Sequence, residues 1–142
     1  MTSLLGVVAS ASAADSRQHI NASGYDIYYG LVPAQVATQH PQSHEERTMH
    51  GGRLPARDGY HLLIALFDSG GARVTQAEIR ATVAELGMAG TSKVLEPMQI
   101  DGTTSFGGYF VLSGEGPYRI DVQARVPDRA APVEAVFEFK RR

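Results

Sequence analysis

The sequence predicts an all-β domain, and three observations support this fold class. The 142 residues include 15 glycines, seven prolines and six tyrosines, a composition that suits short strands joined by many turns. Short apolar segments are separated by turn residues about every 8–12 positions. Residues 118–126 alternate strictly between apolar and polar side chains. About seven such strands are typical of an immunoglobulin-like β-sandwich, here preceded by an irregular N-terminal extension.

The clearest strand is residues 118–126, in which alternate side chains would face the core and the solvent. The inward set is Tyr118, Ile120, Val122, Ala124 and Val126. The segment His61–Phe67 is almost continuously apolar instead, which indicates a strand buried on both faces. It is followed by Asp68-Ser69-Gly70-Gly71, a turn in which the glycines adopt positive φ at little cost.

The segment Arg73–Leu86 fits two structures. Thr75 and Glu78 have the spacing of a helical capping box. However, apolar and polar residues alternate with period two from Ala77 to Val83, which is the pattern of a strand. We favour the strand.

The remaining strands are predicted from shorter apolar patterns. Residues 93–100 contain Pro97, which favours an edge position. The turn Asp101-Gly102 separates this strand from the next one, residues 103–112, and the final strand is 133–140. Near the N-terminus, Tyr25–Val32 suggests an edge strand that Pro33 ends. Its tyrosines either pack on the sandwich or form an exposed face for a partner.

We divide the chain into residues 1–13, 14–59 and 60–142: a signal-peptide remnant, an N-terminal extension and the β-sandwich domain. Leu4–Ala9 is apolar and leads into Ala11-Ser12-Ala13, a small-residue cleavage pattern, so we expect cleavage before Ala14 and export to the periplasm. The polar stretch Asp15–Ser23 is expected to fray.

Composition and motifs exclude several function classes. A formal net charge of −2 gives no reason to expect nucleic acid as a partner, and there is no apolar run of the length that spans a membrane. The absence of cysteine excludes disulfides and thiolate ligands. No Gly-x-Ser-x-Gly, His-Glu-x-x-His or phosphate-loop pattern occurs in its proper context, so the chain is not expected to be an enzyme.

The segment His40–His61 carries the one cluster of residues with distinctive chemistry. Four of the five histidines of the chain lie in this segment, together with one of the four methionines. Imidazole and thioether are ligands that copper accepts, and a loop with this spacing could bring several of them around one ion. The predicted metal ligands are His40, His44, Met49, His50 and His61.

Several of these side chains also have ordinary structural interpretations. His61 opens a buried strand, where it is either a fifth metal donor or a partly buried histidine that hydrogen-bonds to the backbone. Histidines in a polar loop can serve solubility alone, and Glu45-Glu46 suggests a solvated charge pair. His19 is given no role. Met88 and Met98 flank the stretch after the third predicted strand and are further candidate donors if that stretch lies near the histidine loop.

From Tyr60 onward, the order of motifs resembles the YtkA-like group of exported immunoglobulin-fold domains, over roughly 80 residues. The residues that carry the resemblance are Asp68, Val74, Ala77 and Ile79 in the first strand pair, and Gly108-Tyr109-Phe110 and Gly116-Pro117-Tyr118-Arg119-Ile120 in the second. These motifs encode turns and aromatic packing. The resemblance implies an association with metal handling, especially of copper, in bacterial envelopes.

Two functional hypotheses follow from the sequence. In the first, the chain is a non-catalytic periplasmic protein that binds or delivers copper through the His/Met loop, with an envelope protein as partner. In the second, it is an accessory or interaction module of an envelope complex, which binds no metal and presents Tyr25–Val32 and exposed edges of the sandwich to its partner.

Overall fold

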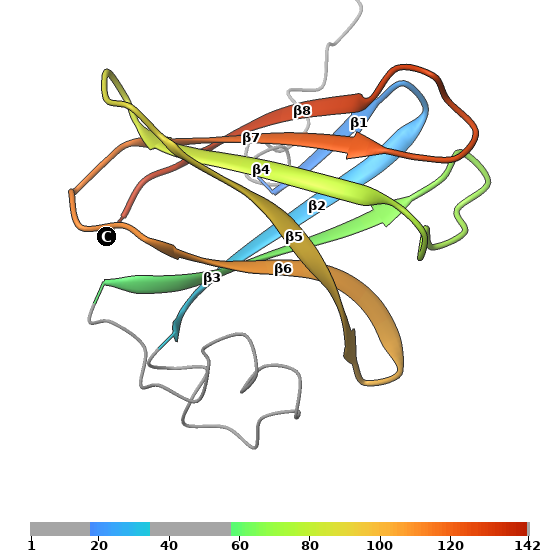
Figure 1. The fold of residues 1–142 in the computed structure, drawn as a ribbon, viewed down its shortest axis with the longest axis horizontal. Helices are drawn as coiled ribbons and strands as arrows, with labels where there is room; N and C mark the ends of the chain where they lie inside the picture. Colours follow the sequence, from blue (N-terminus) through green and yellow to red (C-terminus); the bar gives the residue numbers. More distant parts are fainter. Residues whose placement is uncertain (1–17, 35–57, 142) are drawn as a thin grey trace, which may run out of the picture.

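The computed structural model describes residues 18–34 and 58–141, which form eight antiparallel strands (Figure 1). The strand order across the sheet is β1-β2-β3-β6-β5-β4-β7-β8. The strands are β1 (His19–Ala22), β2 (Tyr25–Pro33), β3 (Gly59–Phe67), β4 (Glu78–Glu85), β5 (Thr91–Ile100), β6 (Thr103–Val111), β7 (Tyr118–Arg125) and β8 (Val133–Phe139).

The sheet curls into a nearly closed barrel because β5 belongs to both of its halves. The first part of β5 pairs with β4 and its second part pairs with β6, so that the strand crosses from one layer to the other (Figure 1). The two end strands, β1 and β8, come into contact on the far side. Tyr29 on β2 donates a hydrogen bond from its hydroxyl to the carbonyl oxygen of Glu138, 3.3 Å away on β8.

The core fills the inside of this barrel with side chains from strands β2 to β8. Strand β7 shows why the sequence forms these elements: its alternate residues are buried and its intervening charged residues lie outside, as the period of a strand requires. The fully buried core side chains include Ile27, Leu62, Ile64, Ile79, Ile120 and Val122. An apolar centre of this size holds the domain together without disulfides.

The all-β class predicted from the sequence is confirmed. The choice of a strand within 73–86 is also confirmed, since Glu78–Glu85 forms β4 and pairs on both sides. The division into two packed sheets is not confirmed, because the strands form one continuous sheet, and they number eight rather than about seven.

The N-terminal residues depart most from the sequence prediction. The expectation that Asp15–Ser23 frays is wrong for His19–Ala22, which forms β1. Ser23 and Gly24 both have positive φ, which makes the tight turn that joins β1 to β2. Strand β2 pairs with β1 and β3, so it is not an edge strand.

Pro97 was expected to mark an edge strand, and this is wrong for β5 as a whole, which pairs with two neighbours. The pairing with β4 ends at Leu95, however, so the stretch around Pro97 pairs only with β6. One side of the strand is therefore free where proline cannot donate a hydrogen bond, which satisfies the same physical constraint.

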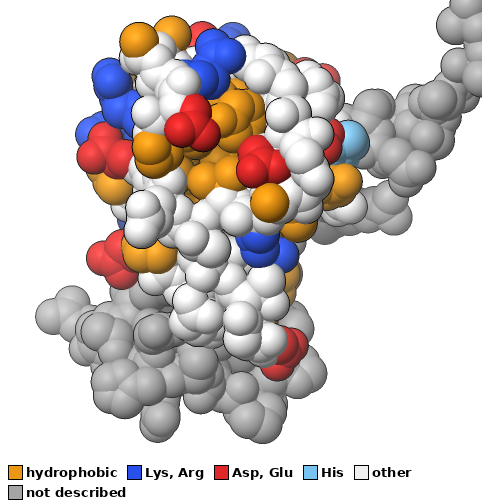
Figure 2. Space-filling view, turned by 90° about the vertical axis from the view of Figure 1, so that its right-hand side faces the viewer, with side chains coloured by type: hydrophobic (Ala, Val, Ile, Leu, Met, Phe, Trp, Pro, Cys, Tyr) orange, Lys and Arg blue, Asp and Glu red, His pale blue; other side chains and the backbone are white. Residues whose placement is uncertain are grey.

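One end of the barrel is hollowed and apolar at its centre (Figure 2). A pocket of about 220 Å³ lies there, with Tyr25, Val74, Val126 and Pro127 in its wall and charged groups at its border. In the described ranges, no helix is long and apolar enough to cross a membrane.

Candidate metal site on the outer face of the barrel

Four of the five predicted metal ligands, His40, His44, Met49 and His50, lie outside the described residues, as does the pair Glu45-Glu46. His61 is described, on β3. Of the predicted site, the structure therefore describes only the residues that lie on the barrel.

The imidazole of His61 is buried on the outer face of β3. Tyr60 and Leu62, its neighbours in the chain, belong to the core, so His61 points away from the inside of the barrel. Only 2% of the residue is exposed. Its neighbours across the sheet are Val32 on β2 and Tyr109 on β6. The ring centroids of His61 and Tyr109 lie 6.3 Å apart, with the rings nearly perpendicular.

Met98 is a second soft donor buried on this outer face. The residue is 1% exposed, yet it is absent from the core cluster; among the described buried apolar residues this holds for Ala34 and Met98 alone. Met98 extends over Gly107 of β6, where an added Cβ would lie 2.7 Å from its Sδ atom and 3.1 Å from Leu63 Cδ2. The thioether of Met98 can occupy this position because residue 107 is a glycine and has no side chain.

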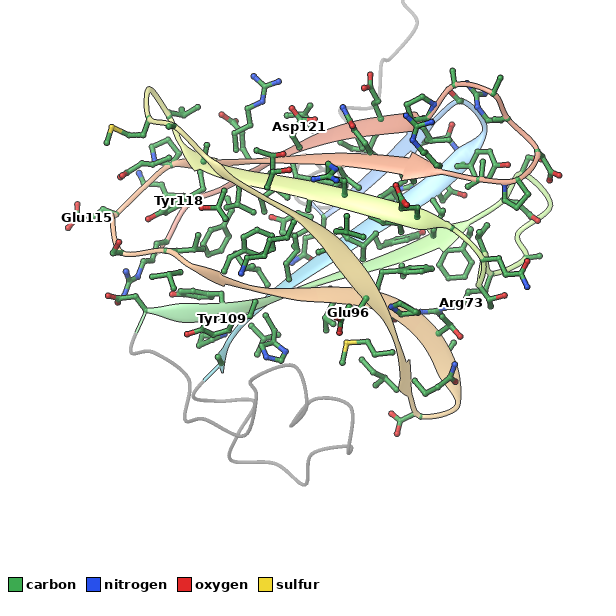
Figure 3. All side chains as sticks on the ribbon, viewed as in Figure 1. Arg73, Glu96, Tyr109, Glu115, Tyr118 and Asp121 are labelled. Carbon is green, nitrogen blue, oxygen red and sulfur yellow. The ribbon has the colours of Figure 1, made fainter. Side chains whose placement is uncertain are left out.

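The strand register places His61 and Met98 on the same face: His61 is level with Tyr109 of β6 and Met98 with Ser105, and the row of Gly107 lies between them. Leu63 pairs with Gly107, and His61 lies two residues from Leu63, which is about 7 Å along a strand. Gly107 also pairs with Glu96 of β5, so that an exposed carboxylate borders the same row. In Figure 3, Tyr109 and Glu96 lie toward the lower side of the ribbon, where β3 and β6 run together. We call His61, Leu63, Met98, Gly107 and Tyr109 the outer-face site.

Two further contacts fix the aromatic border of this site. The ring of Tyr109 covers Gly59, since a Cβ at position 59 would collide with the ring and hydroxyl of Tyr109. The ammonium group of Lys93 lies 5.7 Å from the centre of the Tyr109 ring and donates a hydrogen bond to the Tyr109 carbonyl oxygen. Tyr109 is therefore held from two sides next to His61.

The opposite part of the outer face has a different character. Arg73 donates hydrogen bonds to the carbonyl oxygen of Thr104 at 2.6 Å and to Ser105 Oγ at 2.9 Å. Its guanidinium carbon also lies 5.1 Å from the centre of the Phe67 ring. Ser105 pairs with Met98 across β6 and β5, so this arginine supports the strand next to the thioether.

The structure separates the two methionines that the sequence left as joint candidates. Met88 lies in the turn between β4 and β5 and is 66% exposed. Met98 lies on the second part of β5, against β6. The sequence contains a signal for Met98, namely a methionine two residues from a glutamate on the same side of a strand, but its use required knowing that Gly107 lies opposite.

The donor atoms on this face define what a ligand here could be. Among the described residues, no three His, Cys, Asp or Glu side chains are grouped so as to hold a metal ion. What the barrel supplies is one imidazole on β3 and one thioether on β5, on either side of β6, with the carboxylate of Glu96 on the same face. A nitrogen and a sulfur donor suit copper better than magnesium or calcium, and further ligands would have to come from elsewhere in the chain.

Solved structures with a similar fold include copper-binding proteins. A copper-bound E46Q variant of FetP from uropathogenic Escherichia coli strain F11 is 15% identical with a TM-score of 0.64, over 87% of this chain and 93% of that chain. The copper-reconstituted P19 protein from Campylobacter jejuni is 12% identical with a TM-score of 0.63, over 87% and 92%. A DUF4426 family protein from Pseudomonas aeruginosa PAO1 is 11% identical with a TM-score of 0.60, over 91% and 98%.

At these identities the likeness establishes the fold and not the function. No protein-family model matches the sequence, and no curated protein sequence matches it significantly. The YtkA-like group is not among these matches, although the structural neighbours share the β-rich architecture that the resemblance implied.

Proposed function

We propose that this chain is a non-catalytic, exported protein of the periplasm that binds copper at the outer-face site. His61 and Met98 are the donors on the barrel, and His40, His44, Met49 and His50 supply the remaining ligands. One observation carries the proposal: an imidazole on β3 and a thioether on β5 are buried on the outside of the barrel, on the two strands that flank β6, and apart from the apolar core.

Burial of these two groups is informative because of where it occurs. A methionine in a core is an ordinary space-filling residue, whereas Met98 fills no gap in the core cluster of this barrel. Its position depends on the glycine beneath it. Rigid strands that hold two donors in fixed positions reduce the entropy lost when an ion binds, so the remaining ligands have less to contribute.

The donor set favours copper(I). Thioether sulfur is a soft ligand that selects copper(I) over harder ions, and imidazole accepts the same metal. The structural neighbours support this choice, because FetP and P19 both have copper-bound structures. FetP was also expressed recombinantly in the periplasm of Escherichia coli, which is compatible with the export expected from residues 1–13 of this chain.

The test is a copper(I) titration of the protein from Ala14 onward against a chromogenic chelator. We expect the wild type to take one equivalent of copper from the chelator. The double variant His44→Ala/Met49→Ala should lose this competition, while its metal-free form unfolds at nearly the same temperature as the wild type. The variant His19→Ala, which removes a histidine on β1, is the matched control and should bind as the wild type does.

The same titration separates the proposal from the second hypothesis, an interaction module without metal. Tyr25 and Tyr29 are buried in the core, so of the three tyrosines in Tyr25–Val32 only Tyr28, which is 43% exposed, can contribute to an exposed face. Tyr28 borders a shallow pocket of about 470 Å³ with Asp26, Phe67 and Gly71. If no copper competes with the chelator, this surface becomes the one to use in a pull-down from envelope extracts.

A further inference from the structure

At the opposite end of the barrel from Arg73, the last described residue is tied to the first residue before β3. Arg141 donates a hydrogen bond from Nη2 to Asp58 Oδ1 at 3.0 Å and another from Nη1 to the carbonyl oxygen of Leu112 at 2.8 Å. Leu112 in turn donates its backbone N–H to the carbonyl oxygen of Asp58 at 2.8 Å. We call Asp58, Leu112 and Arg141 the clasp.

The clasp holds both the backbone and the side chain of Asp58. The two members of its ion pair are about one-third exposed, 30% for Arg141 and 34% for Asp58. The guanidinium group also lies 5.9 Å from the centre of the Tyr60 ring. The hydrogen bond to Asp58 raises the pKa of Arg141, which favours the charged form of the guanidinium group.

Asp58 is connected to the outer-face site through Gly59. Gly59 directly follows Asp58 and pairs with Val111, and the ring of Tyr109 occupies the space that a side chain at position 59 would need. Tyr109 is also the partner of His61 across the sheet, with its ring edge-on to the imidazole. A shift of Asp58 would therefore move the backbone of Gly59, against which the ring of Tyr109 packs, and Tyr109 in turn contacts His61.

We infer that Arg141 is a positioning residue for His61: it fixes Asp58, and through Gly59 and Tyr109 it sets the orientation of the imidazole. The role of this contact in metal binding rests on the proposed function, but the contact itself is a property of the metal-free protein. Removal of a residue that orients a metal ligand without touching the metal commonly lowers metal affinity by about 10–100-fold.

The test compares Arg141→Met with Arg119→Met. Methionine keeps most of the length of the side chain and removes the guanidinium group. Arg119 is the matched control because it also forms an ion pair, with Asp121 at 3.2 Å, on the exposed side of β7. Arg141→Lys restores the charge and one hydrogen bond, and it should recover part of any loss. The readouts are copper(I) affinity by chelator competition and the His61 ring signals in nitrogen-15 NMR of the metal-free protein.

We expect Arg141→Met to shift the His61 ring signals and to weaken copper(I) binding about tenfold at unchanged stoichiometry, with Arg119→Met unchanged in both readouts. The inference is overturned if Arg141→Met lowers only the unfolding temperature and leaves the ring signals and the affinity as in the wild type. If the wild type binds no copper, the proposed function fails, and the NMR signals alone decide on the clasp: shifted signals support it and unchanged signals overturn it.

Discussion

The inner and outer faces of β3 and β6 are made by the same two strands and yet have opposite chemistry. On the inner face, Leu62, Ile64 and Phe106 are all but fully buried in a continuous apolar core. On the outer face, His61 is buried beside Tyr109, and Met98 of the neighbouring strand lies over Gly107. The inner face accounts for folding, since burial of each large apolar side chain contributes about 1.5–3 kcal/mol.

The outer face has no such explanation. A histidine and a methionine are an inefficient way to bury surface when Leu, Ile and Val are available, and a glycine within a strand weakens it. The comparison teaches that burial alone does not identify a structural residue. Where a buried side chain lies outside the core and carries a donor atom, as His61 and Met98 do, our proposal assigns it to ligand binding.

The largest effect should follow from a cavity on the inner face. Ile64→Ala removes a fully buried side chain from the core, and we expect it to lower the free energy of unfolding by about 2–5 kcal/mol, measured by urea denaturation. Copper affinity of the folded protein should be unchanged, because the outer face is untouched. A loss of affinity in protein that is still fully folded would show that the two faces are not independent.

A smaller effect is expected from crowding the outer face. Gly107→Ala places a methyl group 2.7 Å from Met98 Sδ, so the thioether must move; we expect about 1–3 kcal/mol of destabilisation together with weaker copper(I) binding. Gly30 pairs with Leu63 from the other side and has nothing within 4 Å of an added Cβ. Gly30→Ala is therefore the matched control, and equal copper affinities for the two variants would contradict our placement of the thioether.

A single hydrogen bond at the end of the barrel should matter less. Tyr118 donates its hydroxyl proton to the carbonyl oxygen of Gly114 at 2.6 Å, and Tyr118→Phe should cost about 1 kcal/mol in the free energy of unfolding.

The same residue gives a signature at high pH. Burial, followed by the charge of Glu85, raises the pKa of Tyr118 above its ordinary value of 10.0. The unfolded chain then loses this proton first, so the contribution of Tyr118 to stability is present below pH 10.0 and is lost as the pH rises through the higher pKa of the folded state. When the free energy of unfolding is measured at several pH values from neutral to strongly alkaline, it should decrease less steeply with pH for Tyr118→Phe than for the wild type. Identical slopes would contradict this explanation.

The smallest effect concerns β1. The hydrogen bond from Asn21, and after it that from His19, lowers the pKa of Asp26 below its ordinary value of 3.8. The contribution of Asp26 to stability is therefore present above its ordinary pKa and is lost as the pH falls through the lower pKa of the folded state. Asn21→Ala should raise the pKa of Asp26 toward the ordinary value in a carbon-13 NMR titration. Gln123→Ala, which removes another exposed amide–carboxylate bond, should leave Asp26 as it is.

Local patterns in the sequence were sufficient for most of the strands. The alternation from Tyr118 to Arg125 and the turn at Asp101-Gly102 both depend on neighbouring residues only, and both are confirmed. Strand β1 was missed because it has only four residues, His19–Ala22, which is too short for a clear alternating pattern. The Ser23-Gly24 turn after them is the hairpin signal that could have revealed the strand.

The candidate site could be predicted only in part, because it depends on which strands pair. His61 was a predicted donor from its residue type, but its place beside Tyr109 follows from the pairing of β3 with β6, two strands that are separated in the sequence by β4 and β5. The position of Met98 needs Gly107 opposite it, and no local rule relates the two. His40, His44, Met49 and His50 remain predictions, since they lie outside the described residues.

The most direct test of the outer-face site is X-ray absorption at the copper edge, with copper(I) bound to the wild type, Met98→Leu and Met88→Leu. Leucine has about the volume of methionine, so each exchange removes a sulfur atom with little change in packing. We predict that Met98→Leu loses one sulfur neighbour of copper and binds more weakly, whereas Met88→Leu, in the exposed turn, equals the wild type. An unchanged sulfur count in Met98→Leu would contradict the assignment of the barrel as a source of copper ligands.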